Sequence, residues 1–564
     1  MLLLNLNLLA TAPGGVARLR ELILTLAVQG KLVPQDLQDE PASELLKKIR
    51  AEKDRLIAEG KIKRDKPLAE ITEAEKPYGL PVGWEWVRLP EITYNLGQGA
   101  PTEKFTYIDV AAIDNEKGVV TEAAETVEAA DAPSRARKNV TVGTVLYSTV
   151  RPYLKNIAIV EKDYAPRAIA STAFAIMHPH GGLHSKYLLH YLRSSVFTDF
   201  VSSKAVGIAY PAINDANFFE GVIALPPTKE QSRIVTRVEE LMRLCDALEA
   251  KGQLEAAQHA QLVSTLLGTL TSSETPEQLT ENWQRIATHF DLLLDRPQAV
   301  DALEQTILQL AVRGMLVPQD LQDEPASELL KKIRIDKNRL IAECKIKRDK
   351  PLPLISDDEK PFALPQGWEW ARVGSIGATQ TGGTPASSKP EYFDGNFPFI
   401  GPGQITTGGK ILPPEKFISE RGRLESSVAE PGDVLMVCIG GSIGKCAAAS
   451  YATAFNQQIN SIHPVLASSE YVLNAMSASE FMATIVGTAT GSATPIISKG
   501  KWDLLLLPVP PLAEQSRIVN RVESLLRLCF ELRQRMTASQ STQARLAEAL
   551  VTDLPALHCA KVHP

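Results

Sequence analysis

Few residues of this chain stand at spacings that support covalent chemistry. No Gly-x-Ser-x-Gly, His-Glu-x-x-His or Asn/Asp-Pro-Pro-Tyr/Phe sequence occurs, so the signatures of a serine hydrolase, a zinc protease and an amino-methyltransferase are missing. The run GGSIGKC at 440–446 resembles a phosphate-binding loop. However, Ile439 stands where that loop needs its first glycine, and Cys446 where it needs a serine or threonine. We therefore predict that the chain is not itself an enzyme and carries no cofactor.

Histidine and cysteine predict no metal site either. Four clustered histidines lack a carboxylate or cysteine at ligand spacing and are interpreted as core or solvated side chains: His178, His180, His184 and His190. The six cysteines form no Cys-x-x-Cys pair, which is typical of reduced thiols in a cytoplasmic chain.

Length and charge exclude several classes of function. The chain has 564 residues, 44% of them hydrophobic, which suffices for several domain cores. No stretch approaches the ~18 continuous apolar residues of a membrane span. With 60 basic and 66 acidic residues the formal net charge is −6, which argues against a general, histone-like nucleic-acid binder. A binder whose basic residues gather on one face remains compatible with this charge.

Charge is segregated within residues 87–229. Residues 132–167 hold seven basic and two acidic residues with three interleaved tyrosines, whereas residues 115–131 hold one basic and five acidic residues. A basic, tyrosine-bearing stretch beside an acidic one fits a DNA-facing loop, and a solvated surface explains it equally well.

Residues 371–513 are instead rich in amides and hydroxyls, which lie in expected loops at 380–385, 403–409 and 456–458. Asn and Gln pair with adenine edges, and Arg or Lys with guanine, although turn chemistry also explains these segments. Two further basic loops suit contact with phosphate or with a partner, or are simply solvated. They comprise Lys61, Lys63, Arg64, Lys66 and Lys345, Lys347, Arg348, Lys350.

An internal repeat organises these residues. LVPQDLQDEPASELLKKIR at 32–50 returns unchanged at 316–334, a shift of 284 positions. KIKRDKPL, GWEW and EQSRIV each recur at the same shift, whereas residues 87–229 and 371–513 align only toward their ends. The chain therefore consists of two copies of one unit, each with a conserved frame around a diverged insert.

Periodicity predicts the elements of each copy. Helices are expected over 19–29 and 41–59 and over their counterparts 303–313 and 325–343. Within the inserts we expect strands at 141–147, 156–160, 433–439 and 459–462, and helices at 185–202 and 469–486. The predicted fold class is α+β, with two α/β domains that each contain a twisted, mostly antiparallel sheet.

A long helix follows each insert. Ile518, Val522, Leu525, Cys529, Leu532 and Met536 form a heptad seam, and the first copy shows the same seam until it weakens at Gly252. Each helix is expected to run ~35 residues, or ~50 Å. We predict that the two helices form an antiparallel coiled coil, related by a pseudo-twofold axis, with the inserts at opposite ends. A ligand with its own dyad and a long repeat, such as duplex DNA, suits this arrangement. A buried amphipathic helix is the alternative to such pairing.

Together these features resemble the specificity subunit of a type I restriction–modification system. The resemblance extends nearly end to end. It includes LPVGWEW and LPQGWEW before the inserts, PP-x-x-EQSRIV after them, TYIDVAAID with YSTVRPYLKN in the first insert, and TGGTPASSKPEYFDGNFPFIGPGQIT with GGSIGKCAAA and FNQQINSI in the second.

The resemblance implies that each insert reads one part of a bipartite DNA site while the helices set the spacer and dock partners. The implied partners are double-stranded DNA, two modification subunits that methylate adenine N6, and, in some assemblies, restriction subunits. S-adenosylmethionine, ATP and Mg are expected on those partners rather than on this chain.

On this interpretation the chain divides into an N-terminal helical frame (1–82), target-recognition domain 1 (83–229), a central helical frame (230–366), target-recognition domain 2 (367–513) and a C-terminal long helix (514–564). The candidate DNA-binding residues of the first domain are Arg135, Arg137, Lys138, Arg151, Tyr153, Lys155, Tyr210 and Asn214. Those of the second are Gln380, Thr384, Lys389, Gln404, Ser442, Lys445, Asn456, Gln457 and Gln458.

Two other functions stay open. The chain fits a helical scaffold whose inserts bind protein or RNA partners, and dependence on two DNA blocks would separate this reading from DNA recognition. An autonomous methyltransferase is disfavoured by the missing tetrapeptide.

Overall fold

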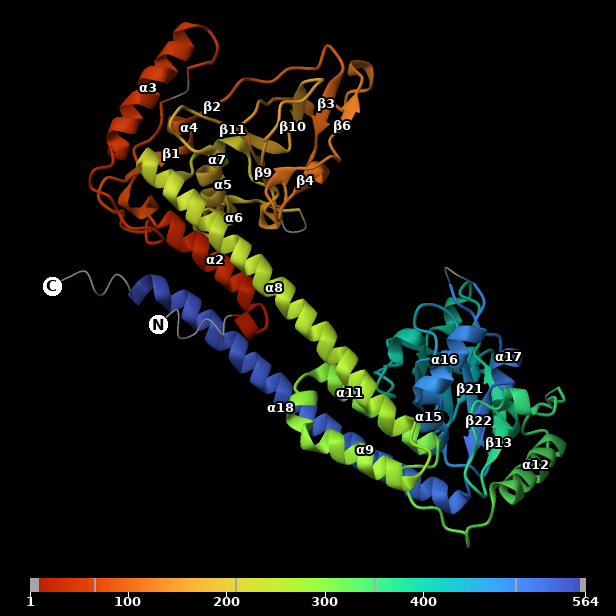
Figure 1. The fold of residues 1–564 in the computed structure, drawn as a ribbon. Coiled ribbons are helices and arrows are strands. Elements are labelled where there is room, and N and C mark those ends of the chain that lie inside the picture. Colours follow the sequence, from red (N-terminus) through yellow and green to blue (C-terminus); the bar gives the residue numbers. More distant parts are fainter. Residues whose placement is uncertain (1–9, 65–66, 208–209, 349, 492–493, 558–564) are drawn as a thin grey trace. The chain divides into compact units, whose positions relative to one another are not determined.

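A computed structural model describes residues 10–64, 67–207, 210–348, 350–491 and 494–557. The chain forms two compact units (Figure 1). Unit 1 comprises Met1–Leu254 and Gln540–Pro564, and unit 2 comprises Glu255–Ser539.

The frame of unit 1 begins with α2 (Gly15–Val28) and α3 (Ala42–Ala58). Both match the expected helices, and Gly30 follows α2 with a φ of 68°, a left-handed conformation that glycine adopts without strain. Pro41 is the N-cap of α3 rather than a residue of its first turn. The corresponding helices of unit 2 are α11 (Pro297–Val312) and α12 (Ala326–Ala342), so the repeated sequence folds alike in both copies.

The first insert is closed by an antiparallel pair of strands, β1 (Glu85–Arg88) and β12 (Val222–Leu225). A four-stranded sheet has the order β6-β3-β10-β7. Its strands are β3 (Phe105–Ile108), β6 (Glu125–Val127), β7 (Ala136–Asn139) and β10 (Ala168–Ser171). A six-stranded sheet has the order β2-β11-β8-β9-β5-β4. Its strands are β2 (Thr93–Tyr94), β4 (Ile113–Asp114), β5 (Val119–Val120), β8 (Val145–Ser148), β9 (Ile157–Ile159) and β11 (Phe174–Pro179).

The second insert repeats this topology without counterparts of β4 and β5, although most of its sequence does not align. β13 (Glu369–Arg372) pairs with β22 (Leu506–Val509) to close it. One four-stranded sheet has the order β16-β15-β20-β17, and the other β14-β21-β18-β19. Their strands are β14 (Gly377–Thr381), β15 (Phe397–Ile400), β16 (Lys416–Ile418), β17 (Ser427–Ala429), β18 (Val434–Val437), β19 (Cys446–Ala448), β20 (Thr453–Phe455) and β21 (Ile459–Pro464). The mixed α/β class is thus confirmed for both inserts.

Pairing within the sheets is mostly antiparallel, as expected. In each insert, one four-stranded sheet also contains a parallel pair, at the same place in its strand order. β10 pairs with β3 in parallel in the first insert, and β15 pairs with β20 in parallel in the second. A further parallel contact joins β5 to β9. Parallel pairing matters for function because it brings the carboxyl ends of two strands to one edge of the sheet.

Two predicted helices are each two helices in the structure. Residues 185–202 contain α5 (Ser185–Arg193) and the start of α6 (Ser195–Lys204), and residues 469–486 contain α15 (Ser469–Ser477) and most of α16 (Ser479–Thr488). Ser194 and Ala478 lie between them with extended backbone, which ends one helix and starts the next. Periodicity alone did not reveal this break, since the apolar positions continue across it.

The repeated sequence motifs contact one another at the base of each insert. The Trp84 indole donates to the buried carboxylate of Glu230 over 3.0 Å, and Gln35 donates to its other oxygen over 2.8 Å. Trp368, Glu514 and Gln319 repeat this arrangement with both distances at 3.0 Å. We call these two clusters the Trp–Glu locks. They tie GWEW to EQSRIV and so hold together the two ends of each insert.

The long helices exceed their expected length. α8 runs over Thr228–Thr271, continuing through Gly252, and α18 runs over Leu512–Leu557. α8 separates the two sheet-containing domains, as predicted. In unit 2 the seam of α18 joins the core that also holds Leu303 and Ile307 of α11. The antiparallel pairing of α8 with α18 along their length stays a prediction, as do the domain boundaries.

Shorter helices complete the two units. They are α4 (Leu89–Ile92), α7 (Asp215–Phe219), α9 (Pro276–Thr288), α10 (Phe290–Leu293), α13 (Val373–Ile376), α14 (Glu420–Leu424) and α17 (Lys499–Asp503). Within the described part of the chain, no helix combines the length and apolar character needed to cross a membrane. Cys245, Cys344, Cys438, Cys446 and Cys529 are free thiols, and Cys559 lies outside the described residues.

Candidate nucleic-acid interface

One edge of the first insert gathers segments that are distant in sequence. The Thr149 amide donates to the Ala173 carbonyl over 2.8 Å, the Arg151 amide to the Pro211 carbonyl over 2.8 Å, and the Ile213 amide to the Thr149 carbonyl over 3.0 Å. The turn after β10, the loop after β8 and the loop 206–212 therefore meet where β3 and β10 end. We call this surface the loop edge of the first insert. It consists of Arg135, 149–155, 172–173, 206–207 and 210–212.

Arg151 is the central charged group of this edge. Its guanidinium lies 4.3 Å from the centroid of the Tyr210 ring, a cation–π contact. Its φ is 49°, and that of Lys155 is 50°, so two non-glycine residues within five positions hold left-handed backbone. Such conformations cost about 1–3 kcal/mol each and cluster at functional sites. Arg151 has no ion-pair partner among the described residues, which leaves its charge available to a ligand.

The other predicted residues of the first insert divide into two groups. Tyr153 and Tyr210 lie on the loop edge with 53% and 67% of their surfaces exposed. Arg135 lies on the same edge because its carbonyl accepts from the Thr172 amide, and Arg135 is exposed as well. Lys155 donates to the Arg193 carbonyl over 3.3 Å.

Three predicted residues instead bind other residues of the insert, and of these only Lys138 is buried. Lys138 is buried and donates to the Phe174 carbonyl and to Asp215 over 2.6 and 2.7 Å. Asn214 accepts from the Asn217 amide as the N-cap of α7, and the Arg137 guanidinium donates to the Ser134 carbonyl.

The second insert builds the same edge from different residues. The Cys438 amide donates to the Gln458 carbonyl over 2.7 Å, the Gly440 amide to the Pro495 carbonyl over 2.9 Å, and the Ile497 amide to the Cys438 carbonyl over 2.9 Å. These three bonds match those of Thr149, Arg151 and Ile213. The loop edge of the second insert consists of 382–384, 401–404, 438–445, 456–458, 490–491 and 494–496.

Amide and hydroxyl side chains converge on this second edge. The Thr384 hydroxyl donates to the Gln457 side-chain carbonyl over 2.5 Å, and the Asn456 amide donates to that of Gln458 over 3.1 Å. Gln404 accepts from the Gly401 amide over 3.0 Å. Gly382 packs so closely on Asn456 that a Cβ at position 382 would lie 2.0 Å from the Asn456 carbonyl oxygen, so only glycine fits there. Five predicted residues are thus brought together: Thr384, Gln404, Asn456, Gln457 and Gln458.

The remaining predicted residues of this insert lie nearby or point elsewhere. Ser442 and Lys445 belong to the loop that follows β18 and so lie on the loop edge. Gln380 donates to the Val428 carbonyl over 2.7 Å inside the domain. Lys389 is bound to Tyr392, its ammonium 3.0 Å from the hydroxyl and 4.9 Å from the ring centroid.

Sequence reasoning named single residues of these loops, such as Tyr210 and Arg151, but did not identify the loops as equivalent parts of the two inserts. The loops 206–212 and 490–496 each pair their own ends, Val206 with Ala212 and Thr490 with Ile496. Gly207 and Gly491 have left-handed backbone with φ of 112° and 96°. The glycine and the following proline recur at the same shift of 284 residues, which was the available signal. The equivalence of the loop after β8 to the loop after β18 was not visible in the sequence, because Arg151 and its counterpart Gly440 differ by 289 positions instead of 284.

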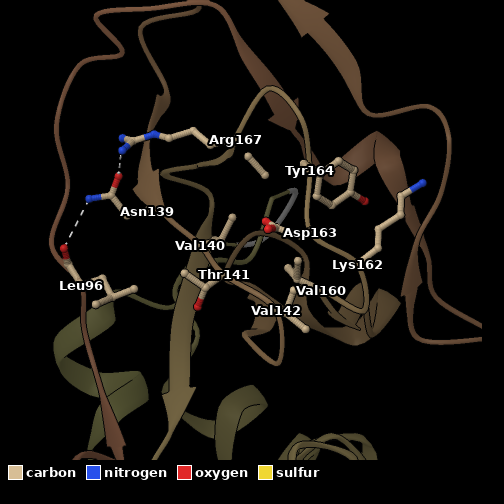
Figure 2. A pocket seen from close by; sticks show the side chains of 11 residues that line it. Leu96, Asn139, Val140, Thr141, Val142, Val160, Lys162, Asp163, Tyr164 and Arg167 are labelled. Atoms are coloured by element: carbon tan, nitrogen blue, oxygen red, sulfur yellow. Dashed lines mark hydrogen bonds between the residues drawn. The ribbon is translucent and has the colours of Figure 1, made fainter.

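A cavity of about 350 Å³ lies at the opposite end of β10 from the loop edge (Figure 2). There Arg167 donates to the Asn139 side-chain oxygen over 3.1 Å, and Asn139 donates to the Leu96 carbonyl over 3.3 Å. Burial raises the pKa of Tyr164. Two of the seven basic residues counted in 132–167, Lys162 and Arg167, therefore lie away from the loop edge.

The clustered histidines are partly core and partly solvated, as interpreted from the sequence. His178 and His180 are buried, whereas His184 is exposed. Burial lowers the pKa of His178 to about 4, so its ring is neutral near pH 7. Within the described residues no group of three or more metal-binding side chains comes together.

The basic frame loops are exposed where the structure describes them. Lys61 pairs with Glu59 over 2.7 Å, and Lys345 pairs with Glu343 over 2.8 Å. Lys63, Arg64, Lys347, Arg348 and Lys350 are exposed as well, and Lys66 lies outside the described residues.

Each loop edge thus offers hydrogen-bonding groups on a rigid base. The first edge presents an arginine stacked on a tyrosine, which can donate a bidentate pair of hydrogen bonds. The second presents amides, each with a donor and an acceptor. Planar ligands with donor and acceptor edges, such as nucleobases, match both sets.

Comparison with known proteins agrees with this chemistry. The sequence profile of a family described as "Type I restriction modification DNA specificity domain" matches residues 365–539. The specificity subunit of the type I restriction enzyme EcoAI of Escherichia coli is 37% identical over 562 residues, covering 95% of this chain and 93% of that protein. The EcoEI specificity subunit of the same species is 36% identical over 561 residues with the same coverage.

Two solved structures are also similar. The HsdS subunit from Thermoanaerobacter tengcongensis is 25% identical, covering 85% of this chain and 98% of that one, with a TM-score of 0.39. A chain from work on complex assembly and conformational transition of the type I R-M system has the same identity and coverage, with a TM-score of 0.49.

Proposed function

The chain belongs to the type I restriction enzyme specificity subunits, which determine DNA sequence specificity, and from that premise we propose that each insert reads one part of a bipartite DNA site through its loop edge. The observation that carries this proposal is the matched backbone of the two edges. Three equivalent hydrogen bonds hold the same loops in both inserts, yet the side chains displayed there differ. A common scaffold with different polar side chains is what two readers of different base sequences require.

The side chains suggest how each edge reads DNA. Arg151 is positioned to donate to the O6 and N7 atoms of a guanine, as arginines in major grooves commonly do. The amides of Asn456, Gln457 and Gln458 suit adenine N6 and N7, with Thr384 and Gln404 supporting them. Lys155 and Arg135 supply positive charge for phosphates beside the bases.

Methyl transfer and cleavage are assigned to partner subunits in this proposal. Two modification subunits dock on the repeated frames and long helices, one for each repeat, and restriction subunits join that complex. S-adenosylmethionine, ATP and Mg belong to those partners in this proposal, which the missing amino-methyltransferase tetrapeptide and the incomplete phosphate-binding loop of this sequence support. Contacts at the loop edges contribute part of the energy that flips the target adenine into the partner's pocket.

Methylated-base mapping identifies the site. Genomic DNA from cells with and without this chain, in the presence of its modification subunits, should differ in adenine methylation at one sequence with two fixed blocks and a spacer of constant length. Duplexes in which either block or the spacer length is altered should then bind the assembled complex at least tenfold more weakly. Binding that ignores both blocks and spacer would favour the scaffold whose inserts bind protein or RNA partners.

A further inference from the structure

A groove in the frame of unit 2 lies between α12, residues 348 and 350–355, and β13. Its volume is about 900 Å³. The groove has an apolar floor and rim that include Leu330, Ile341, Leu352 and Trp370, and Leu354 on the rim has 95% of its surface exposed. An apolar side chain so far out of the core is suited to contact another molecule. We call this surface the basic groove because most of the charged residues that line it are basic.

The charges around the groove are strongly one-sided. Of the described residues that line it, six are basic and one is acidic, namely Lys331, Arg334, Lys337, Arg348, Lys350, Arg372 and Glu369. The buried Arg372 side chain forms an ion pair with Glu359, and the Lys337 ammonium donates to the Gly374 and Gly377 carbonyls. Arg334, Arg348 and Lys350 are exposed and have no ion-pair partner among the residues that the structure describes. These three charges face solvent beside exposed apolar side chains.

The first repeat carries the same six basic residues but has more acidic residues among them. At the positions of Asn338, Leu354 and Ser375 the first repeat has Asp54, Glu70 and Glu91. Its equivalent surface therefore has four acidic residues in place of one. Glu91 lies 3.9 Å from Arg50, the counterpart of Arg334, and so provides the partner that Arg334 lacks. Two surfaces of the same fold thus differ in the charge and polarity of three residues.

The basic groove lies at the far end of the second insert from its loop edge. Lys337 of α12 contacts Gly377 at the start of β14, which pairs with Pro464 at the end of β21. The loop edge adjoins the other ends of these strands, where Thr381 pairs with Asn460. The four steps along the strand from Gly377 to Thr381, at ~3.4 Å each, place ~14 Å of sheet between the groove and the loop edge. Figure 1 likewise shows α12 on the side of unit 2 away from α16, which leads into the loop 490–496.

We propose that the basic groove binds an acidic, amphipathic segment of a partner protein, and that the first repeat does not bind this segment. Charge complementarity selects glutamate- and aspartate-rich chains, and the apolar floor selects those that also present leucine-like side chains on one face. DNA phosphates would not need Leu354 or Trp370, and by the proposed function DNA lies at the opposite end of the insert. The two repeats would then share partners that dock on common features, while this partner docks once per chain.

The test uses the full chain and a labelled synthetic peptide as probe. The peptide is a helix former of about five turns, with leucines at every third or fourth position and glutamates between them. Its controls are the same peptide with lysine for glutamate and the same peptide with serine for leucine. Fluorescence anisotropy should show one site per chain for the acidic amphipathic peptide, and at least tenfold weaker binding of both controls.

Two matched variants decide between specific and general attraction. Exchanging the groove residues for those of the first repeat, N338D/L354E/S375E, should weaken peptide binding at least tenfold, and the first repeat shows that this fold accepts those residues. The reciprocal change D54N/E70L/E91S should create a second peptide site. Binding of target DNA by either variant should equal that of the wild type, so a failure of the groove is visible separately from a failure of DNA reading.

Three results would overturn the proposal. They are absence of peptide binding to the wild-type chain, equal binding to the wild type and N338D/L354E/S375E, and displacement of the peptide by duplex DNA that lacks the recognition site. The last result would make the groove a phosphate-binding surface instead.

Discussion

Arg151 combines a left-handed backbone, a stacked tyrosine and a charge without an ion-pair partner among the described residues. The strain of that backbone is tolerated because its amide and carbonyl are both held, by Pro211 and Leu154. A side chain held in this way loses little rotational freedom on binding, which raises the affinity of each hydrogen bond it makes.

Replacing Arg151 with alanine should therefore weaken binding of target DNA by about 1–3 kcal/mol and relax the preference for one base pair of the first block. Titration of duplexes that vary at each position of that block measures both effects. Arg167→Ala is the matched control, because Arg167 is an exposed arginine of the same insert that lies at the cavity of Figure 2 instead of the loop edge. Equal losses in both variants would show that Arg151 contributes only general charge.

His463 supplies a pH-dependent contact within the second insert. Its Nδ1 lies 2.6 Å from a carboxylate oxygen of the buried Asp433, and this hydrogen bond raises the pKa of His463. A raised pKa in the folded state means that the stabilisation is fully present below the unfolded value near 6.5 and is lost as pH rises through the folded value. His463→Gln should therefore lower the free energy of unfolding more at about pH 6 than at about pH 8.5. Denaturant titrations at both values measure this difference, and an equal loss at both would contradict it.

The Trp–Glu locks explain at the level of elements why the frames stay alike while the inserts diverge. Each lock joins the strand that enters an insert to the helix that leaves it, next to the β1–β12 or β13–β22 pair. With both ends of the insert held, the loops at its far edge can change without loss of the fold. Arg233 with Asp39 and Arg517 with Asp323 repeat a second contact between the same segments over 2.6 and 2.5 Å.

Trp84→Phe should lower the free energy of unfolding of unit 1 by about 1–3 kcal/mol, because it leaves a buried oxygen of Glu230 without its indole donor. Trp86→Phe, two residues away, is the control. The Trp86 ring packs on Tyr78 at 5.0 Å between centroids, and a phenylalanine keeps that contact. Urea titration followed by circular dichroism compares the two variants, and the lock would not be stabilising if both behaved like the wild type.

Burial also determines how protonation of the glutamate in each lock affects stability. Burial raises the pKa of Glu230, and its counterpart Glu514 is raised for the same reason. A carboxyl whose pKa rises on folding favours the folded state more when it is protonated. The locks therefore stabilise each insert base through hydrogen bonds and packing, and the negative charge itself opposes folding.

At the scale of the whole molecule, the predicted pseudo-twofold axis determines how the two inserts meet the two blocks of the DNA site. If α8 and α18 pair antiparallel, exchanging the two inserts amounts to rotating the molecule by half a turn. The chain in which residues 89–221 and 373–505 exchange places should then recognise the same bipartite site with the same spacer. Methylated-base mapping in cells carrying the exchanged chain measures this. Recognition of the two blocks in swapped order would show instead that the repeats are related by translation.

Some properties followed from the sequence alone because they depend on short-range pattern. The repeat, the frame helices, the heptad seam and the family resemblance all rest on residues at fixed spacing, and helix formation responds directly to that spacing. Val238 and Val522, for example, occupy equivalent seam positions and are both buried. The long helices were correctly located, and α8 continues as a helix past Gly252, where the seam weakens.

Other properties were decided only by tertiary structure, because they depend on which distant segments meet. Parallel pairing of β15 with β20 brings Gln404 and Asn456 to one edge, and no local pattern encodes that pairing. Lys138 counted as a free basic residue until the fold buried it against Asp215. The strand-by-strand equivalence of the two inserts was likewise not visible, since backbone hydrogen bonds preserve a fold after its side chains have diverged.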